Sequence, residues 1–246
     1  MYDTDTTDKY LWISDVDNTV LGDFEGLHQL SLALSHQRIK LIIAFSSGRS
    51  IESLKASLVE NPLMPTPDFL VGEVGTKIEE IVTGERDHGY ITKLENSWDR
   101  DKIKELLSHQ PWQIQPEEFQ SSLKLSYYAK PETEPVESAR TVFAEHNIEV
   151  TTIYSSKRDL DFLPPGAGKG GAVARLVEML GMPKERVIVS GDSGNDLLMF
   201  KQGCKGIVVG NAHQELKNLQ DPNIYHAQGI VANGVLEGLR HFGVIT

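Results

Sequence analysis

The chain has 246 residues, 39% of them hydrophobic, and carries a formal net charge of −11 at pH 7. This length fits one large α/β domain or a core with a smaller inserted domain. The acidic balance argues against a nucleic-acid partner, because neutralising phosphates needs a basic surface. It is compatible with a small phosphorylated substrate, which needs only a local group of cations and backbone N–H groups.

A single cysteine, Cys204, excludes an internal disulfide and is compatible with a reducing compartment. The first six residues are acidic and polar, the opposite of a signal-peptide start. No apolar run approaches the length that a bilayer requires. These features predict a cytoplasmic protein without a membrane partner.

An apolar run at residues 10–13 predicts a first buried strand, and Asp15 and Asp17 follow it. Side chains alternate along a strand, so carboxylates two positions apart should point the same way. Two like charges held that close must share a cation or retain a proton. The pattern therefore favours catalysis or metal binding. The alternative is an Asp- and Asn-rich turn that leaves the strand.

The next segments predict an anion-binding turn. Apolar spacing indicates a helix at residues 24–36, and residues 41–45 form a second buried run. Ser47 and Gly48 follow this run, and Ser50 is suited to cap the helix that comes next. At such a strand-to-helix turn, backbone N–H groups and the helix N-terminus can receive an anion.

The pattern changes between residues 84 and 164. The strand candidates there alternate apolar and polar residues, which is typical of antiparallel strands with one wet face. Two amphipathic helices fit among them, one containing Ile103 and the other Ala139. We therefore predict an inserted α+β cap domain at residues 84–164, and a core formed by residues 1–83 and 165–246.

Buried runs return after residue 164. A helix is expected at residues 170–181, then a strand at 186–190, followed by an acidic turn with Asp192, Asn195 and Asp196. The other core elements expected are a strand at residues 69–71, a helix from residue 197, a strand at 206–209 and a last helix around Val235. Polar clusters thus follow several buried strands, which predicts a Rossmann-like open parallel sheet with its ligands at that edge.

With these polar clusters, the sequence resembles the haloacid dehalogenase-like phosphatase superfamily over nearly its whole length. Its four motifs match Asp15-Val16-Asp17-Asn18-Thr19, Ser47, Lys169 and Gly191-Asp192-Ser193-Gly194-Asn195-Asp196. The insertion resembles the large α+β cap of its sugar-phosphatase branch, where sucrose-phosphatases are the closest resemblance. Supporting segments are Ser47-Gly48-Arg49-Ser50, Val71-Gly72-Glu73-Val74-Gly75-Thr76, Leu125-Ser126-Tyr127, Tyr154-Ser155-Ser156 and Asp159-Leu160-Asp161-Phe162-Leu163-Pro164.

The resemblance implies a Mg²⁺-dependent phosphatase. Asp15 would attack phosphorus and form an aspartyl-phosphate. Asp15, the backbone carbonyl of Asp17 and the Asp192 carboxylate would be the metal ligands, with Asp196 as a further ligand or an anchor behind them. The Asp17 side chain would protonate the leaving sugar oxygen and afterwards activate water.

The phosphate would be held by Lys169, by the Ser47 hydroxyl, which stands where Thr is more usual, and by N–H groups near Gly48. Alternatively, Lys169 is a helix lysine facing solvent, which is unfavourable beside the positive end of the helix dipole unless an anion lies there. Asn195 binds the phosphate, holds the acidic loop, or merely caps the following helix. Arg49 reaches the substrate or pairs with a surface carboxylate.

Substrate choice is expected in the cap, which would close over the sugar. Sugars need hydrogen-bonding groups and a flat apolar surface, although each candidate can also be an ordinary surface residue. The candidates are Tyr127, Lys157, Arg158, Asp159 and Asp161. Lys157 and Arg158 stand where the resemblance leads us to expect a Gly and one Lys.

The expected substrate is a disaccharide phosphate, with sucrose 6-phosphate first. A mannosylfructose phosphate and a broader range of hexose phosphates are alternatives within the same class. A mutase is disfavoured, because no feature that retains a phosphosugar is evident. The rival from another class is a non-catalytic sugar-phosphate sensor, or a subunit that stabilises an upstream sugar-phosphate synthase.

Overall fold

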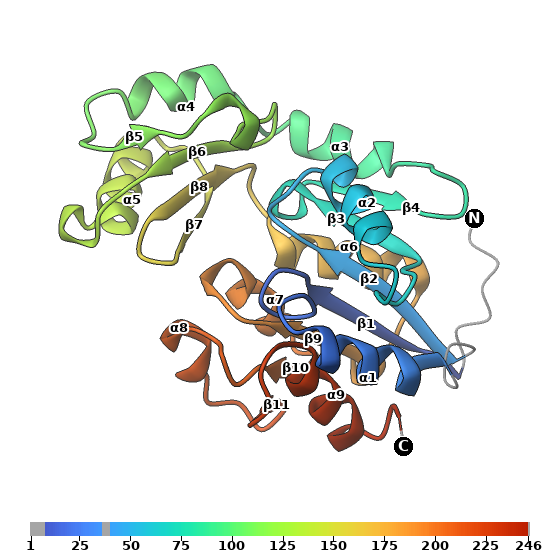
Figure 1. Cartoon of the computed structure of the whole chain (residues 1–246). Helices are drawn as coiled ribbons and strands as arrows, with labels where there is room; N and C mark the ends of the chain where they lie inside the picture. Colours follow the sequence, from blue (N-terminus) through green and yellow to red (C-terminus); the bar gives the residue numbers. More distant parts are fainter. Residues whose placement is uncertain (1–7, 36–39, 246) are drawn as a thin grey trace.

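The larger lobe is built on a seven-stranded sheet with the order β11-β10-β9-β1-β2-β3-β4 (Figure 1). The computed structural model describes residues 8–35 and 40–245. The strands are β1 (Tyr10–Asp15), β2 (Leu41–Ser46), β3 (Phe69–Gly72), β4 (Lys77–Glu80), β9 (Val187–Gly191), β10 (Lys205–Val208) and β11 (Ile224–His226). All neighbours pair in parallel except β3 and β4. The predicted open parallel sheet is confirmed, with an antiparallel edge strand that the sequence pattern did not indicate.

Helices cover both faces of this sheet, as its continuous apolar strands require. They are α1 (Phe24–Ser35), α2 (Ile51–Glu60), α3 (His88–Glu95), α6 (Lys169–Leu180), α7 (Leu197–Phe200), α8 (Gln214–Lys217) and α9 (Val231–His241). α1 packs beside α9 and α6 beside α7, on opposite faces (Figure 1). The predicted helix at 24–36 is present to residue 35, and residue 36 lies outside the described residues.

Local signals explain where the helices next to the polar turns begin and end. The Ser50 hydroxyl accepts a hydrogen bond from the Ser53 N–H, which confirms the predicted cap of α2. Gly181 adopts a left-handed conformation with φ 60°, which ends α6. That helix begins at Lys169, one residue before the predicted start, so the lysine belongs to its first turn.

The smaller lobe is an antiparallel sheet with the order β5-β6-β8-β7, backed by two helices (Figure 1). Its elements are α4 (Arg100–Leu106), β5 (Gln113–Ile114), β6 (Leu125–Tyr128), α5 (Pro135–Glu145), β7 (Thr151–Ser155) and β8 (Asp159–Leu163). Leu125, Leu160 and Phe162 enter this lobe's own hydrophobic core with residues of α4 and α5. The predicted inserted antiparallel module is therefore confirmed as a separate sheet.

The limits of the cap domain at residues 84 and 164 remain predictions. Tyr90 and Leu94 of α3 pack in the core of the larger lobe, and the Tyr90 hydroxyl donates to the Gly75 carbonyl at 3.0 Å. Ile103 and Leu107 pack in the core of the smaller lobe instead. We therefore propose that the cap begins after α3 rather than before it.

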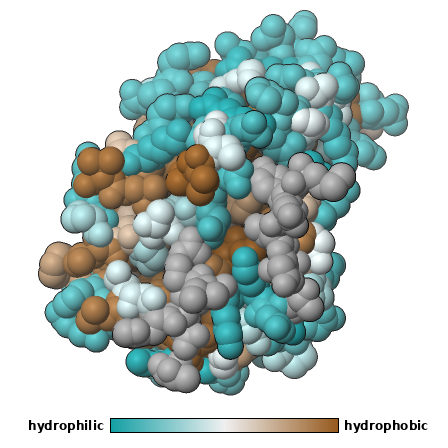
Figure 2. Space-filling view, turned by 90° about the vertical axis from the view of Figure 1, so that its right-hand side faces the viewer, coloured by the Kyte–Doolittle hydropathy of each residue, from teal (hydrophilic) through white to brown (hydrophobic). Residues whose placement is uncertain are grey.

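Polar side chains dominate much of the surface face in Figure 2, and apolar ones form separate groups among them. Exposed large apolar residues such as Val59 and Val82 are ordinary on a globular surface. Within residues 8–35 and 40–245, every helix is too short or too polar to span a bilayer.

Candidate active site

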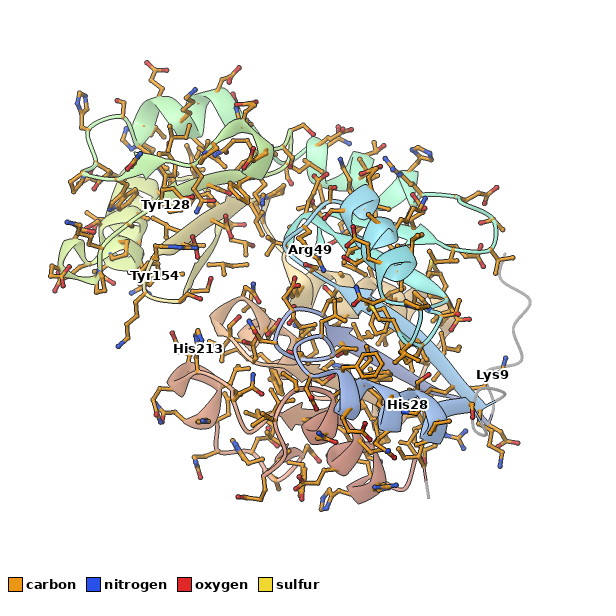
Figure 3. All side chains as sticks on the ribbon, in the orientation of Figure 1. Lys9, His28, Arg49, Tyr128, Tyr154 and His213 are labelled. Atoms are coloured by element: carbon orange, nitrogen blue, oxygen red, sulfur yellow. The ribbon has the colours of Figure 1, made fainter. Side chains whose placement is uncertain are left out.

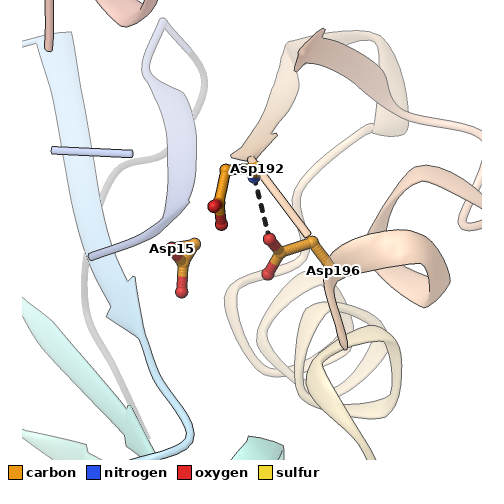
Figure 4. A group of neighbouring side chains, drawn as sticks. All are labelled: Asp15, Asp192 and Asp196. Carbon is orange, nitrogen blue, oxygen red and sulfur yellow. Dashed lines mark hydrogen bonds between the residues drawn. The ribbon is translucent and has the colours of Figure 1, made fainter. Parts of the chain in front are cut away.

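Three buried carboxylates meet where two neighbouring strands of the larger sheet end. Asp15 is the last residue of β1, and Asp192 directly follows β9, which pairs with β1. Asp196 comes from the short turn at Gly194–Asp196, and one oxygen of each carboxylate lies within 4.8 Å of the others (Figure 4). Asp196 Oδ2 accepts the Asp192 N–H at 3.0 Å and the Ser193 N–H at 3.1 Å, which locks the acidic turn.

Lys169 lies fully buried beneath these carboxylates. Its Nζ is 2.5 Å from Asp15 Oδ1 and 2.6 Å from Asp196 Oδ1, so it bridges two of the three acids. The solvent-facing alternative for this lysine is therefore wrong. A charge at the N-terminal turn of α6 is tolerated because the anions lie there as well.

The charges of this cluster do not balance, because one lysine faces three buried carboxylates. Burial, partly offset by Lys169 and reinforced by Asp196 and Asp192, raises the pKa of Asp15 to about 8. Burial and Asp196 likewise raise the pKa of Asp192 to about 6. Burial lowers the pKa of Lys169, but Asp15 and Asp196 outweigh it and raise that pKa overall. Asp15 is therefore fully ionised at neutral pH only if another cation joins the cluster.

The donor set fits Mg²⁺, which prefers carboxylate, carbonyl and water oxygens. Asp15, Asp192 and Asp196 offer three such oxygens in one place, and no sulfur or imidazole is among them. The Asp17 carboxylate does not join this group, and metal binding by the backbone carbonyl of Asp17 remains a prediction.

Asp17 occupies a different position from Asp15. β1 ends at Asp15, and the chain turns over the next residues, where Asn18 has a φ of 59°. The Asp17 side chain is 52% exposed. Its Oδ2 lies 3.0 Å from Arg49 Nε and 3.5 Å from the Ser47 hydroxyl. The carboxylate that Arg49 pairs with therefore belongs to the site itself. A second Arg49 nitrogen, Nη1, donates to the Ser57 hydroxyl at 2.7 Å.

A cleft of about 610 Å³ lies between the acidic cluster and the cap, a volume in the range of small-molecule sites. Of the predicted site residues, it is lined by Asp15, Asp17, Ser47, Gly48, Arg49, Asp192, Asn195, Arg158, Asp159 and Asp161. Lys169 and Asp196 support it from below through their contacts with Asp15 and Asp192. Asn195 Oδ1 accepts from the Ser193 hydroxyl at 3.3 Å, while Ser193 and Asp196 cap the acidic turn.

The structure does not bring Tyr127 to this cleft, which corrects the sequence prediction. Its ring packs edge-on against Trp112 and Phe162 in the core of the cap. Alternation along β6 places Tyr128 on the opposite face, and Tyr128 lines the cleft. Figure 3 shows Tyr128 on the cap sheet, with Arg49 and His213 on the core at the opening between the lobes.

The cap side of the cleft is a hydrogen-bonded polar network. Asp161 is buried, and its Oδ1 accepts from the Ser126 hydroxyl at 2.5 Å. Burial raises the Asp161 pKa, although Lys124 and the Ser126 hydrogen bond oppose this. Gln115 Nε2 donates to Asp159 Oδ1 at 3.0 Å. Such a network holds acceptors and donors in fixed directions.

The cap also contacts the acidic turn of the core. A Cβ on Gly194 would lie 2.9 Å from the Tyr154 carbonyl oxygen and 3.3 Å from the Cα of Ser155. The end of β7 therefore rests on the turn that positions Asp196. This approach requires the absence of a side chain at Gly194, a reason that the motif alone did not reveal.

Several cleft residues were missed by sequence reasoning. They are Glu73, Gln115, Phe119, Lys124, Tyr128, Ser155 and His213. Asn211 was also missed, although its Nδ2 donates to the Asn18 carbonyl at 2.8 Å and thereby holds the loop that carries Asp17. For Tyr128 the strand alternation was a usable signal, and for Glu73 the position directly after β3 was one as well. For His213, which lies well beyond the end of β10, the sequence offers none.

Comparison with known proteins agrees with this geometry. A family model described as sucrose-6F-phosphate phosphohydrolase matches residues 8–243. A mannosylfructose-phosphate phosphatase from Agrobacterium fabrum is 35% identical over 94% of this chain and 96% of its own length. Sucrose-phosphatase 1 of Nicotiana tabacum is 34% identical over 96% of this chain, which spans only 60% of that relative.

A solved structure extends the likeness to the arrangement of the two lobes. The sucrose-phosphatase of a Synechocystis strain, in complex with sucrose and phosphate, superposes with a TM-score of 0.89 at 30% identity. The alignment covers 96% of this chain and 98% of that one. The two proteins therefore share the same HAD-like fold, in the core sheet as well as in the cap.

Proposed function

The chain belongs to the sucrose-6F-phosphate phosphohydrolase family and is a sugar-phosphate phosphatase, and we propose that it uses Mg²⁺ to hydrolyse a disaccharide phosphate. The observation that carries this proposal is the cleft, which joins a buried acidic cluster over Lys169 to a polar cap face. Its volume of about 610 Å³ is large enough for a sugar phosphate of two rings.

In the proposed reaction, a carboxylate oxygen of Asp15 attacks phosphorus while the bond between phosphorus and the sugar oxygen breaks. The Asp17 carboxyl gives its proton to that leaving oxygen, so the sugar departs as an alcohol. Asp17 then takes a proton from a water molecule, whose oxygen attacks the phosphorus of the aspartyl-phosphate. Inorganic phosphate leaves and Asp15 is regenerated.

Each neighbour of Asp15 supports this cycle from a fixed position. Lys169 holds Asp15 by a short ion pair and keeps one of its oxygens in place. Arg49 and the Ser47 hydroxyl lie beside Asp17 Oδ2 and orient the proton carrier. Bound Mg²⁺ supplies the positive charge that keeps Asp15 ionised and neutralises charge on the phosphate.

Phosphate binding is assigned to the turn after β2 and to the acidic loop. The Ser47 hydroxyl, the backbone of Gly48 and the Asn195 amide line the cleft next to Asp15. Arg49 lines the cleft as well, and its backbone N–H donates to the Ser47 hydroxyl at 3.2 Å. Because the transferred phosphoryl spreads charge over three oxygens, such donors act mainly by positioning and charge stabilisation.

Sucrose 6-phosphate is the first substrate that we propose. The likeness to a structure that binds sucrose and phosphate supports it, and Asp161, Asp159 and Tyr128 give the cap face the polar and aromatic groups that a sugar needs. A mannosylfructose phosphate is the second candidate, because the Agrobacterium relative matches over almost its whole length.

The test is a panel of sugar phosphates assayed for phosphate release at matched Mg²⁺. We expect kcat/KM for one of the two disaccharide phosphates to exceed that for glucose 6-phosphate and fructose 6-phosphate by about a hundredfold or more. Equal rates on simple hexose phosphates contradict the disaccharide proposal. Binding of sugar phosphates without any phosphate release supports the sensor alternative instead.

A further inference from the structure

Glu73 is held in an unusual backbone conformation on the core side of the cleft. It follows β3 with a φ of 52°, and Val74 follows it with a φ of 57°, values that are uncommon for residues other than glycine. The Glu73 N–H donates to the Arg49 carbonyl at 2.8 Å, and the Val74 N–H donates to the Ser47 carbonyl at 3.0 Å. The left-handed backbone thus ties Glu73 to the proposed phosphate-binding turn.

The Glu73 side chain is incompletely paired. The residue is 9% exposed and lines the cleft. Its Oε1 pairs with Lys77 Nζ at 2.6 Å, but its buried Oε2 has no hydrogen-bond partner among the described residues. A buried carboxylate oxygen without a donor costs free energy, and strained, unpaired groups of this kind gather at ligand sites.

A second unpaired atom belongs to the residue that Glu73 holds. Arg49 Nη2 is buried and has neither a hydrogen-bond partner nor an ion pair within the described residues, whereas Nε forms the ion pair with Asp17 and Nη1 donates to Ser57. The cleft wall therefore offers one free acceptor and one free donor on two residues joined by a backbone hydrogen bond. Because a hydroxyl group both donates and accepts, sugar hydroxyls can pair with groups of either kind.

We propose that Glu73 Oε2 accepts a hydrogen bond from a sugar hydroxyl of the bound substrate and so determines specificity from the core side of the cleft. This rests on the proposed sugar-phosphate phosphatase function. The phosphate itself cannot be the partner, because it would repel the carboxylate. A second metal ion is disfavoured, because Lys77 already balances the charge of Glu73.

Glu73 is fixed to the turn that carries Ser47, where we place the phosphate. The hydroxyl that it binds therefore belongs to the sugar ring attached to the phosphate. The cap network around Asp161 remains available for the more distant ring. Specificity is then divided between the two lobes, and a correct substrate contacts both of them.

The test compares Glu73→Ala with the wild type on the best disaccharide phosphate and on p-nitrophenyl phosphate, a monoester without sugar hydroxyls. We expect kcat/KM for the sugar phosphate to fall about ten- to a hundredfold, the range for a hydrogen bond to a charged group, mainly through KM. For p-nitrophenyl phosphate it should change less than about threefold. Lys77→Ala, which breaks the same ion pair but keeps the carboxylate, should leave the ratio of the two substrates unchanged.

Equal losses on both substrates overturn the proposal, since they show that Glu73 supports the turn rather than the sugar. An unchanged ratio in Glu73→Ala, or an equal change of ratio in Lys77→Ala, overturns it as well. If the wild type released phosphate from p-nitrophenyl phosphate but from no sugar phosphate, the proposed function itself would fail, and that outcome is distinguishable from the others.

Discussion

The two walls of the cleft recognise their ligands by different physical means. On the core wall, charges lie at the ends of buried parallel strands, and Lys169 is fully enclosed between Asp15 and Asp196. On the cap wall, polar side chains stand on one face of an antiparallel sheet, as Ser126 and Asp161 do. In our proposal the core wall carries out the chemistry on the phosphate and adds one sugar contact through Glu73, whereas the cap wall serves substrate selection alone. Chemistry is therefore confined to the core wall, while both walls contribute to the choice of substrate.

The largest effect is expected at Asp15. Asp15→Asn keeps the shape of the side chain but removes the nucleophile, so phosphate release from every substrate should fall by about a thousandfold or more. The melting temperature at pH 7 should not fall, because one of three crowded buried carboxylates is lost. A phosphate-release assay with a thermal melt checks both. Residual turnover close to that of the wild type would show that another group attacks phosphorus.

The next effect is expected at Lys169, where activity and stability are linked. Lys169→Met leaves Asp15 and Asp196 without their buried counter-charge, which should destabilise the fold by about 3–5 kcal/mol and lower kcat by about a hundredfold. Urea unfolding with and without Mg²⁺ checks this, and the cation should restore part of the lost stability. Lys102→Met, at an exposed lysine of α4, is the matched control. Loss of stability that Mg²⁺ does not reduce contradicts a shared charge cluster.

Two neighbouring tyrosines of β6 have different roles in the cap: Tyr127 packs in its core, and Tyr128 lines the cleft. Tyr127→Ala should cost about 3–5 kcal/mol of stability, because it opens a cavity against Trp112 and Phe162. The folded enzyme should keep its kcat/KM. Tyr128→Ala should instead lower kcat/KM for the disaccharide phosphate by about tenfold with little change in stability. Denaturant melts and kinetics on both variants decide, and the opposite pattern would mean that the assigned faces of β6 are reversed.

The smallest effect concerns pH and Asp161. Burial raises the pKa of this carboxyl above its ordinary value of 3.8. The folded state therefore binds its proton more tightly than the unfolded state, and stability is lost as pH rises from about 4 through the folded pKa. Asp161→Asn should be more stable than the wild type at pH 7 by a few degrees in melting temperature, with the difference vanishing near pH 4. A difference that persists at pH 4 would point to packing rather than charge.

The core site could be predicted because its residues lie in short contiguous motifs that follow apolar runs. Continuous apolar runs located β1 and β9, although both strands extend slightly beyond the predicted ends. The parallel-sheet rule then brought Asp15 and Asp192 together. The sequence pattern did not show how deeply each side chain is buried. From the sequence, Lys169 looks like an exposed helix lysine, because its burial depends on the packing of α6 against the sheet. Asp17 looks equivalent to Asp15, because the sequence does not show that β1 ends at Asp15.

The presence of the cap was predicted, but the side chains that it presents to the cleft were not. Alternation along β6 was visible, yet Tyr127 was proposed as a sugar contact although its apolar neighbour Leu125 packs in the same cap core. The helix α3 was missed because only Tyr90 and Leu94 of its residues are buried. Glu73 depends on a left-handed turn between β3 and β4, a conformation that tertiary contacts impose and that no local propensity favours.

The most direct test of the central claim is to quench the enzyme during turnover of a disaccharide phosphate labelled on phosphorus, and to locate the label on the protein. The account predicts that the label is attached to the peptide that carries Asp15, that it disappears after the substrate is exhausted, and that Asp15→Asn carries none. Label on a different side chain, or rapid turnover with Asp15 never labelled even when the quench is faster than release, would contradict it.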